Sequence, residues 1–320
     1  MEQRALGNSN LRVSSVGLGC NNFGGRMNLD GARKVVHRAL DLGVTLFDTA
    51  DMYGNRGGSE EILGNMFGAR RKDILLATKF GMPMDGDGKL KGASRNYVMT
   101  AVEASLKRLK TDWIDLYQLH QPDPKTPIEE TLRALDDLVR QGKVRHIGCS
   151  NLSAVQVTEA QAISQDKGLA PFISCQDEYS LLVRDIEREL MPAIEKHGLG
   201  LLPYFPLSGG LLTGKYKRNA PMPAGARLTG AKNMADRYMT DAGWRAIEGL
   251  ESFVAKRGKT MLELAFGWLL AHRPVASVIA GASTPEQVEQ NVKASSWALT
   301  SDDLAVIDTL APIGTIPSRR

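Results

Sequence analysis

The stretch LFDTADMYGNRGGSEEILG, from Leu46 to Gly64, begins like a buried strand and ends like the start of a helix. Apolar Leu46 and Phe47 are followed at once by Asp48 and Asp51, and then by Tyr53 and a run of glycines. A strand that leads directly into a helix is the repeating unit of α/β proteins. The stretch also places two carboxylates and a phenol where an apolar strand ends, and a buried strand gains nothing from such groups unless they are paired.

The same unit recurs along the chain. Short runs rich in Val, Ile and Leu alternate with longer segments of helical period, as in residues 128–143, where Ile128, Leu132, Leu135 and Val139 share one face. Eight such repeats predict an α/β fold, a parallel sheet closed as a (β/α)8 TIM barrel, with an open doubly wound sheet as the competing arrangement. The expected strands are residues 14–20, 45–50, 74–80, 113–120, 144–151, 172–179, 199–205 and 275–283.

Two segments are expected to lie outside the repeated strand–helix units of the barrel. Residues 3–14 resemble a β-hairpin, because the turn residues 7–10 (GNSN) separate two short apolar runs, and this N-terminal hairpin could cap the N-terminal mouth of the barrel. Residues 216–240 contain turn residues and charges but little helical period, so they predict a long loop after strand seven, over the catalytic face. No linker divides residues 1–320, which are expected to form a single domain.

The composition excludes several classes of protein. A chain of 320 residues with 42% hydrophobic and 24% charged residues is typical of a globular protein with a large core. The three cysteines, Cys20, Cys149 and Cys175, form no Cys-x-x-Cys pair and favour a reducing, cytoplasmic location. The sequence has no signal-peptide core, no run near the roughly 18 apolar residues of a membrane span, and no basic block. We therefore expect neither a membrane nor a nucleic-acid partner.

Two glycine-rich stretches match nucleotide-binding motifs only in part. Residues 17–25 (GLGCNNFGG) have Asn22 in place of the third glycine of the dinucleotide fingerprint, and a tight turn is the simpler interpretation. Residues 209–216 (GGLLTGKY) lack the Ser or Thr that a P-loop needs for Mg²⁺, because Tyr216 stands there. Glycine backbone together with Lys215 can still bind a phosphate.

Ionisable side chains lie at the ends of three successive predicted strands. Asp48 ends the second strand, with Tyr53 on the loop after it, Lys79 ends the third and His120 the fourth. In a barrel these ends meet on the face that carries active sites. Each residue alone has a structural interpretation, since a buried Asp–Lys pair or histidine often serves only packing. Together, the four favour a catalytic site.

The combination of a phenol, an ammonium group, a carboxylate and an imidazole limits the reactions that the site can catalyse. The sequence shows no metal-ligand spacing and no Gly-x-Ser-x-Gly elbow, and a lysine beside Asp48 makes that carboxylate unfit as a glycosidase acid. A cation about 4 Å from Tyr53 would lower the phenol's pKa from about 10 by roughly three units before desolvation opposes it. Such a phenol can protonate a carbonyl oxygen while a cofactor delivers hydride. We therefore expect carbonyl reduction without a metal.

Six blocks resemble the aldo-keto reductase family, specifically the branch with bacterial reductases and the β-subunits of voltage-gated potassium channels. They follow the family order over nearly the whole chain: FDTADMYG (47–54), ATKFG (77–81), DLYQLHQPDP (115–124), GKVRHIGCSN (142–151), PLSGGLLTGKY (206–216) and VIAGASTPEQVEQN (278–291). The resemblance implies a barrel that binds NADP(H) without a Rossmann domain and reduces a small aldehyde or ketone.

The resemblance also implies roles for individual residues. Tyr53 would be the general acid, Lys79 would lower its pKa and pair with Asp48, and His120 would orient the substrate carbonyl. The implied cofactor contacts are Gly19, Cys20 and Asp48; Ser150, Asn151 and Gln176 at the carboxamide; Tyr204 under the nicotinamide ring; Phe205, Pro206, Leu207, Ser208, Gly209, Gly210 and Lys215 at the pyrophosphate; and Gly281, Ser283, Gln287, Gln290 and Asn291 at the adenosine end.

The last block departs from the family pattern. It has Ser283, Thr284 and Gln287 where many relatives have Arg or Lys for the 2′-phosphate, and Gln290 where Glu is common. Arg227, in the long loop, could supply the missing charge, and we expect NADPH to be preferred over NADH with the loop ordering around it.

The end of the first strand is polar where relatives often place an aromatic residue, and we expect Cys20, Asn21 and Asn22 to line the substrate pocket. Two other functions stay open. One is a cofactor-binding regulatory subunit with little turnover, as in the channel-associated branch. The other is a barrel hydrolase or lyase that uses Asp48 and His120, which NADPH-consuming turnover would exclude.

Overall fold

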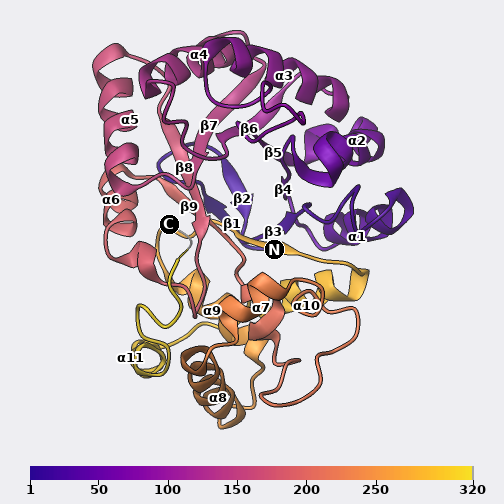
Figure 1. Ribbon diagram of the computed structural model, residues 1–320, viewed down its shortest axis with the longest axis vertical. Helices are drawn as coiled ribbons and strands as arrows, with labels where there is room; N and C mark the ends of the chain where they lie inside the picture. Colours follow the sequence, from indigo (N-terminus) through magenta and orange to yellow (C-terminus); the bar gives the residue numbers. More distant parts are fainter. Residues whose placement is uncertain (319–320) are drawn as a thin grey trace.

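The computed structural model describes residues 1–318, and its centre is a sheet of eight parallel strands surrounded by helices (Figure 1). The first seven strands pair with one another in chain order, and the last pairs with the first. A short bridge between Leu201 and Val275, just before the last strand, brings the remaining edges together. The barrel strands are β3 (Val16–Gly19), β4 (Leu46–Asp48), β5 (Leu75–Phe80), β6 (Ile114–Leu119), β7 (Val144–Ser150), β8 (Phe172–Glu178), β9 (Gly200–Tyr204) and β10 (Val278–Gly281).

A helix follows each barrel strand, which confirms the predicted (β/α)8 barrel. These helices are α1 (Leu29–Asp41), α2 (Tyr53–Phe67), α3 (Arg95–Leu109), α4 (Ile128–Arg140), α5 (Ala154–Lys167), α6 (Leu190–His197), α9 (Met261–Ala271) and α10 (Pro285–Ala294). Three further helices are α7 (Lys232–Tyr238), α8 (Asp241–Ala255) and α11 (Ser301–Leu310), and short 3₁₀ turns are η1 (Gly68–Asp73), η2 (Asp185–Glu187) and η3 (Ser208–Thr213).

The N-terminal hairpin consists of β1 (Gln3–Ala5) and β2 (Arg12–Ser14), paired antiparallel as expected. Its side chains Leu6, Leu11 and Val13 are buried in one apolar cluster with residues of the barrel strands. The backbone of Gly7 lies so close to the start of β9 that a Cβ atom would be 2.5 Å from the carbonyl oxygen of Gly198. The hairpin thus closes the N-terminal end of the barrel and leaves the opposite end for a site.

The predicted loop after strand seven is partly wrong, because the helix α7 lies inside residues 216–240. Met234 and Tyr238 anchor this helix in the core, and both Leu228 and Met234 pack over Gly209. A helix of seven residues shows fewer than two full turns, so its sequence carries little periodic signal. The segment from 217 to 231 is irregular, as expected.

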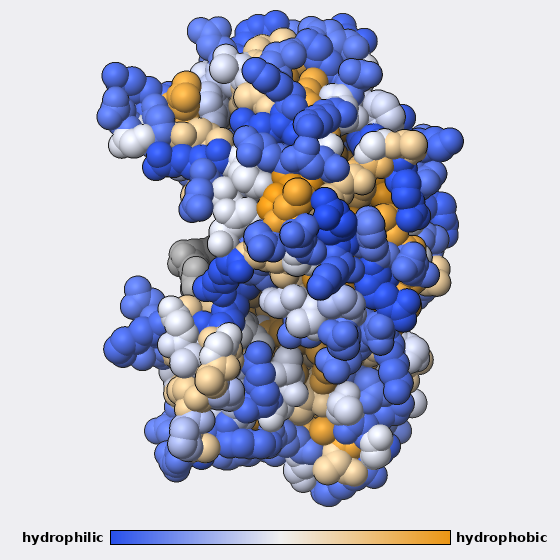
Figure 2. Space-filling view, turned by 90° about the vertical axis from the view of Figure 1, so that its right-hand side faces the viewer, coloured by the Kyte–Doolittle hydropathy of each residue, from blue (hydrophilic) through white to orange (hydrophobic). Residues whose placement is uncertain are grey.

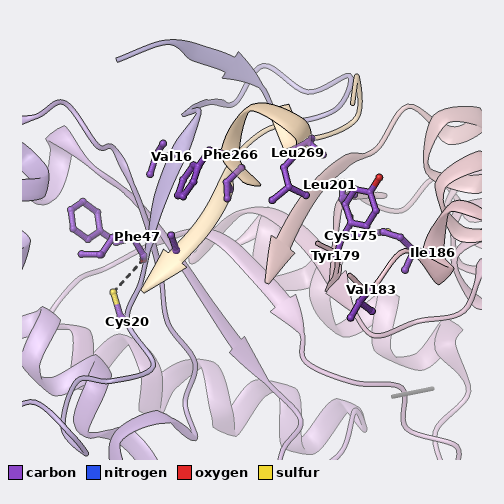
Figure 3. Close-up of a cluster of buried hydrophobic side chains, with 14 of the residues drawn as sticks. Val16, Cys20, Phe47, Cys175, Tyr179, Val183, Ile186, Leu201, Phe266 and Leu269 are labelled. Carbon is purple, nitrogen blue, oxygen red and sulfur yellow. Dashed lines mark hydrogen bonds between the residues drawn. The ribbon is translucent and has the colours of Figure 1, made fainter. Parts of the chain in front are cut away.

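Most of the core lies between the barrel and its helices. Figure 3 shows side chains of β3, β4, β8, β9 and α9 meeting there, with the thiol of Cys20 donating to the carbonyl oxygen of Leu18 at 3.5 Å. All three cysteines are buried free thiols. On the face drawn in Figure 2, hydrophilic residues predominate and hydrophobic ones form only small, separate patches. None of the helices within residues 1–318 has the length and apolar character needed to cross a membrane.

Candidate active site

The centre of the site is a buried ion pair between neighbouring strands. Lys79, at the end of β5, donates from Nζ to both carboxylate oxygens of Asp48, at 2.9 and 2.8 Å, and to the carbonyl oxygen of Thr49 at 2.7 Å. The Lys79 side chain is fully buried, and that of Asp48 is 5% exposed. Gln176 donates to Asp48 Oδ1 at 2.9 Å. Every proton of the ammonium group therefore has an acceptor, as a buried charge requires.

Tyr53 and His120 complete the cluster. The chain turns sharply after Tyr53, since residues 54–57 all have positive φ angles. Lys79 Nζ lies 5.1 Å from the centre of the Tyr53 ring. The rings of Tyr53 and His120 meet edge to face, with their centres 5.7 Å apart. All four residues predicted to be catalytic are thus brought together.

The pKa of Tyr53 differs from the prediction. Burial raises it most strongly, Lys79 lowers it and Asp48 raises it, so the phenol's pKa is above its ordinary value. The expected shift toward neutrality is therefore wrong for this arrangement, because Asp48 neutralises Lys79 and burial disfavours the phenolate. Tyr53 is held as a protonated phenol, which is the form that can donate.

Two neighbouring groups are held neutral by burial. Burial, with a smaller effect from Lys79, lowers the pKa of His120 to about 3. Burial, with repulsion from Glu60, raises the pKa of Asp51 to about 8. Neither carboxylate oxygen of Asp51 has a hydrogen-bond partner among the described residues. At neutral pH, His120 is therefore an uncharged imidazole that can donate one N–H, and Asp51 is largely a carboxylic acid.

A cleft of about 1080 Å³ opens at the carboxyl ends of the strands. Tyr53, His120 and Asp48 line it, while Lys79 lies beneath them. Every predicted cofactor residue lines it except Ser208, whose buried hydroxyl lies 2.9 Å from that of Ser180. Those lining it are Gly19, Cys20, Asp48, Ser150, Asn151, Gln176, Tyr204, Phe205, Pro206, Leu207, Gly209, Gly210, Lys215, Arg227, Gly281, Ser283, Gln287, Gln290 and Asn291.

Comparison with known proteins places the chain in a family. The profile described as the Aldo/keto reductase family matches residues 15–312. The chain belongs to the aldo/keto reductase family. A probable voltage-gated potassium channel subunit beta of Arabidopsis thaliana is 38% identical over 303 residues, with 92% of this chain and 91% of that protein covered.

Two bacterial relatives are oxidoreductases by name. The uncharacterized oxidoreductase YrpG of Bacillus subtilis (strain 168) is 35% identical, with 98% of this chain and 96% of that protein covered. The L-glyceraldehyde 3-phosphate reductase of Escherichia coli (strain K12) is 33% identical, with 96% and 92% covered. These relatives support an oxidoreductase.

In this aldo/keto reductase, several groups predicted to hold the carboxamide already have partners within the protein. Asn151 donates from Nδ2 to the carbonyl oxygen of His120 at 2.9 Å, and its Oδ1 accepts from the Tyr204 hydroxyl at 2.8 Å. Gln176 donates to Asp48. These bonds fix the orientation of the three side chains along the wall of the cleft.

The wall also contains residues that the sequence did not single out. Asn21 and Asn22 line the cleft as expected, but so do Arg26, Met52 and Leu262. Met52 is adjacent to Tyr53, and Arg26 follows the polar end of the first strand by a few residues. Their closeness in sequence to predicted site residues could therefore have indicated that they line the cleft. Among the described residues of this aldo/keto reductase, no three His, Cys, Asp or Glu side chains gather as they would around a metal ion.

Proposed function

We propose that this protein is an NADP(H)-dependent reductase that transfers hydride to the carbonyl carbon of an aldehyde or ketone, with Tyr53 as the general acid. The observation that carries the proposal is the meeting of Tyr53, His120 and the buried Asp48–Lys79 pair at the wall of one large cleft. A hydroxyl and an N–H at this point can both reach one carbonyl oxygen.

The cleft suits a dinucleotide in size and charge. Its volume of about 1080 Å³ exceeds the roughly 300–1,000 Å³ of pockets for drug-sized ligands. Lys215 and Arg227 line it, and the Arg227 guanidinium lies 5.0 Å from the centre of the Phe205 ring. Two cations on one wall are what a pyrophosphate and a 2′-phosphate require.

Two glycines support the same use of the cleft. Gly209 and Gly210 have φ angles of 70° and 95°, which a residue with a side chain rarely adopts. Both line the cleft beside Lys215. A backbone turn without side chains, next to a lysine, lets a phosphate approach the chain closely.

Hydrogen bonds of Gln287 and Thr284 order the start of α10, at the proposed adenosine end of the cleft. Thr284 caps α10, since its hydroxyl accepts from the N–H of Gln287, and Gln287 Oε1 accepts from the N–H of Ser283 at 2.7 Å. The helix N-terminus adds a favourable potential for an anion. We propose that this end and Arg227 together make NADPH the preferred cofactor.

The bound cofactor would supply the hydride, and the side chains of the site supply the proton to the carbonyl oxygen. Tyr53 donates its phenolic proton to the carbonyl oxygen as negative charge develops there, and neutral His120 donates an N–H to the same oxygen. Lys79 stabilises the phenolate that remains, because its ammonium group is held beside the ring. Asp48 keeps Lys79 protonated: burial lowers the lysine pKa, but the aspartate and the local hydrogen bonds raise it above its ordinary value.

A regulatory subunit with little turnover is the second candidate, favoured by the name of the Arabidopsis thaliana relative. One experiment separates the two. Binding is followed by NADPH fluorescence, and turnover by loss of NADPH absorbance with a panel of aldehydes and ketones. The reductase proposal predicts both signals. Binding without turnover on any carbonyl compound would favour the regulatory subunit, and absence of binding would overturn both.

A further inference from the structure

The cleft contains one cation that the proposed reaction does not use. Among the described residues that line it, Asp48 is the only acidic one, and its charge is matched by Lys79. Lys215 and Arg227 are accounted for by the phosphates of the proposed cofactor. Arg26 remains, on the loop between β3 and α1. The wall that carries it therefore has an uncompensated positive charge.

The loop that carries Arg26 is firmly held. Its backbone is closed by hydrogen bonds from Gly24 N to Met27 O and from Met27 N to Asn22 O, both 2.9 Å long. Phe23 and Met27 anchor it in the core, at 0% and 8% exposed. Gly25 and Arg26 form the exposed tip of this turn. The position of the arginine is thus set by the fold, although its side chain is free to reach into the cleft.

The same turn packs against the segment that follows Tyr53. A Cβ atom on Gly24, which has a φ of 71°, would lie 2.7 Å from the backbone of Gly58. A Cβ atom on Gly25 would lie 4.0 Å from the Cα of Gly54, the residue next to Tyr53. The loop of Arg26 therefore lies beside the segment that carries Tyr53, and both residues line the cleft. On its other side the loop borders the proposed adenosine end, since a Cβ atom on Gly281, at the end of β10, would lie 3.8 Å from Asn21 Oδ1 and 3.7 Å from Asn22 Nδ2.

No partner occupies the guanidinium group. Within the part of the chain that the structure describes, Arg26 makes no side-chain hydrogen bond, ion pair or ring contact, and the amides of Asn21 and Asn22 beside it also lack partners. An arginine with five unpaired N–H donors, next to two amides on a cleft wall, matches a carboxylate or a phosphate in charge and geometry.

We propose that Arg26 binds an anionic group on the substrate, so that this reductase prefers carbonyl compounds that carry a carboxylate or a phosphate. The inference rests on the proposed function, since it concerns the same cleft and the same reaction. Arg26 would act on binding and selectivity and take no part in proton transfer.

The test compares pairs of related carbonyl substrates in which one member carries an anionic group and the other is neutral. One pair is 4-carboxybenzaldehyde and its methyl ester, and the other is glyceraldehyde 3-phosphate and glyceraldehyde. The wild-type protein is expected to favour the anionic member of at least one pair, and the pair that responds distinguishes carboxylate from phosphate. Arg26→Gln should lower kcat/KM for that member by about tenfold, the lower end of what a charge-assisted hydrogen bond contributes, because the site is exposed. The neutral member should change less than about twofold by the same reasoning.

Two matched variants complete the experiment. Arg26→Lys keeps the charge and should restore part of the selectivity, which added salt should weaken. Arg245→Gln removes an exposed arginine from α8, outside the cleft, and should change neither substrate. Binding of benzoate and benzamide to the NADPH-loaded protein, followed by cofactor fluorescence, gives a readout without turnover, and only benzoate should depend on Arg26.

Each contrary result has a distinct meaning. Equal losses for charged and neutral substrates, or a matching loss of NADPH affinity in Arg26→Gln, would overturn the inference and leave the reductase intact. If the wild-type protein reduces no member of either pair and no other carbonyl compound, the proposed function fails and the inference falls with it.

Discussion

Replacing Asp48 by Asn tests how much the fold and the site depend on the buried ion pair. Lys79 is fully buried, and Asp48 supplies two of its three hydrogen-bond acceptors. The amide keeps the shape of the carboxylate but removes the only charge that balances the ammonium group. Breaking a buried pair in this way typically costs about 3–5 kcal/mol, a large part of the roughly 5–15 kcal/mol that stabilises a protein.

The dependence of this loss on pH has a definite sign. In the wild-type protein the pKa of Lys79 is raised, so its stabilisation is present below the unfolded-state pKa and is lost as pH rises through the folded-state pKa. Without Asp48, burial dominates and lowers the lysine pKa in the folded state. The unfolded chain then binds the extra proton, and the variant gains stability as pH rises toward about 10.4. The difference between the two proteins should therefore shrink at alkaline pH.

Urea unfolding at pH 7 and near pH 9.5 measures this difference. The double variant Asp48→Asn/Lys79→Met should recover much of the stability, because it removes both charges. Asp115→Asn is a matched control: its buried carboxylate pairs with Arg71 at 2.7 Å and Arg145 at 2.9 Å, outside the cleft. It should lose stability but keep its turnover while folded. A loss below about 1 kcal/mol in Asp48→Asn at both pH values would refute the reasoning, since an unpaired buried charge cannot cost so little.

Three further outcomes follow from the same structure. The folded protein keeps Asp51 protonated up to about pH 8, whereas the unfolded chain releases that proton near pH 4, so the wild-type protein loses stability as pH rises between these values. In urea unfolding, Asp51→Asn should therefore become more stable relative to the wild-type protein over that range, and a constant difference would contradict the burial argument. The ring of His120 should stay neutral from pH 5 to 8, because its pKa is lowered to about 3, and its NMR shifts should therefore stay constant over that range. Arg227→Ala should weaken NADPH binding by about tenfold and leave NADH nearly unchanged in fluorescence titrations, and equal losses would show that Arg227 does not contact the 2′-phosphate.

The barrel could be predicted because its signal is local and repeated. Each strand is a short apolar run and each helix has a regular period, so the expected strands overlap the observed ones throughout. The pairing of Asp48 with Lys79 could also be predicted, because neighbouring parallel strands in a barrel bring their carboxyl ends together. The helix α7 could not be predicted in this way, because its apolar contacts, such as that of Met234 with Gly209, join segments that are far apart in the sequence.

The electrostatics of the site could not be predicted in the same way. The pKa of Tyr53 depends on how completely the ring is buried and on how closely Asp48 neutralises Lys79, which are properties of packing. The neutral state of Asp51 likewise arises from burial beside Glu60, on α2, and nothing in its sequence neighbourhood indicates it. The position of Arg26 at the cleft depends on the packing of its loop against the segment that follows Tyr53, a contact between residues far apart in the sequence.

The central claim is that Tyr53 donates the proton in carbonyl reduction, and Tyr53→Phe tests it most directly. The variant keeps the ring against His120 and Lys79 but has no proton to give. NADPH affinity, measured by fluorescence, should stay within about threefold, since no hydrogen bond to the cofactor is removed. Reductase turnover should fall by at least about a hundredfold, the scale of a lost general acid. A variant that binds NADPH normally and keeps most of the wild-type turnover would contradict the account.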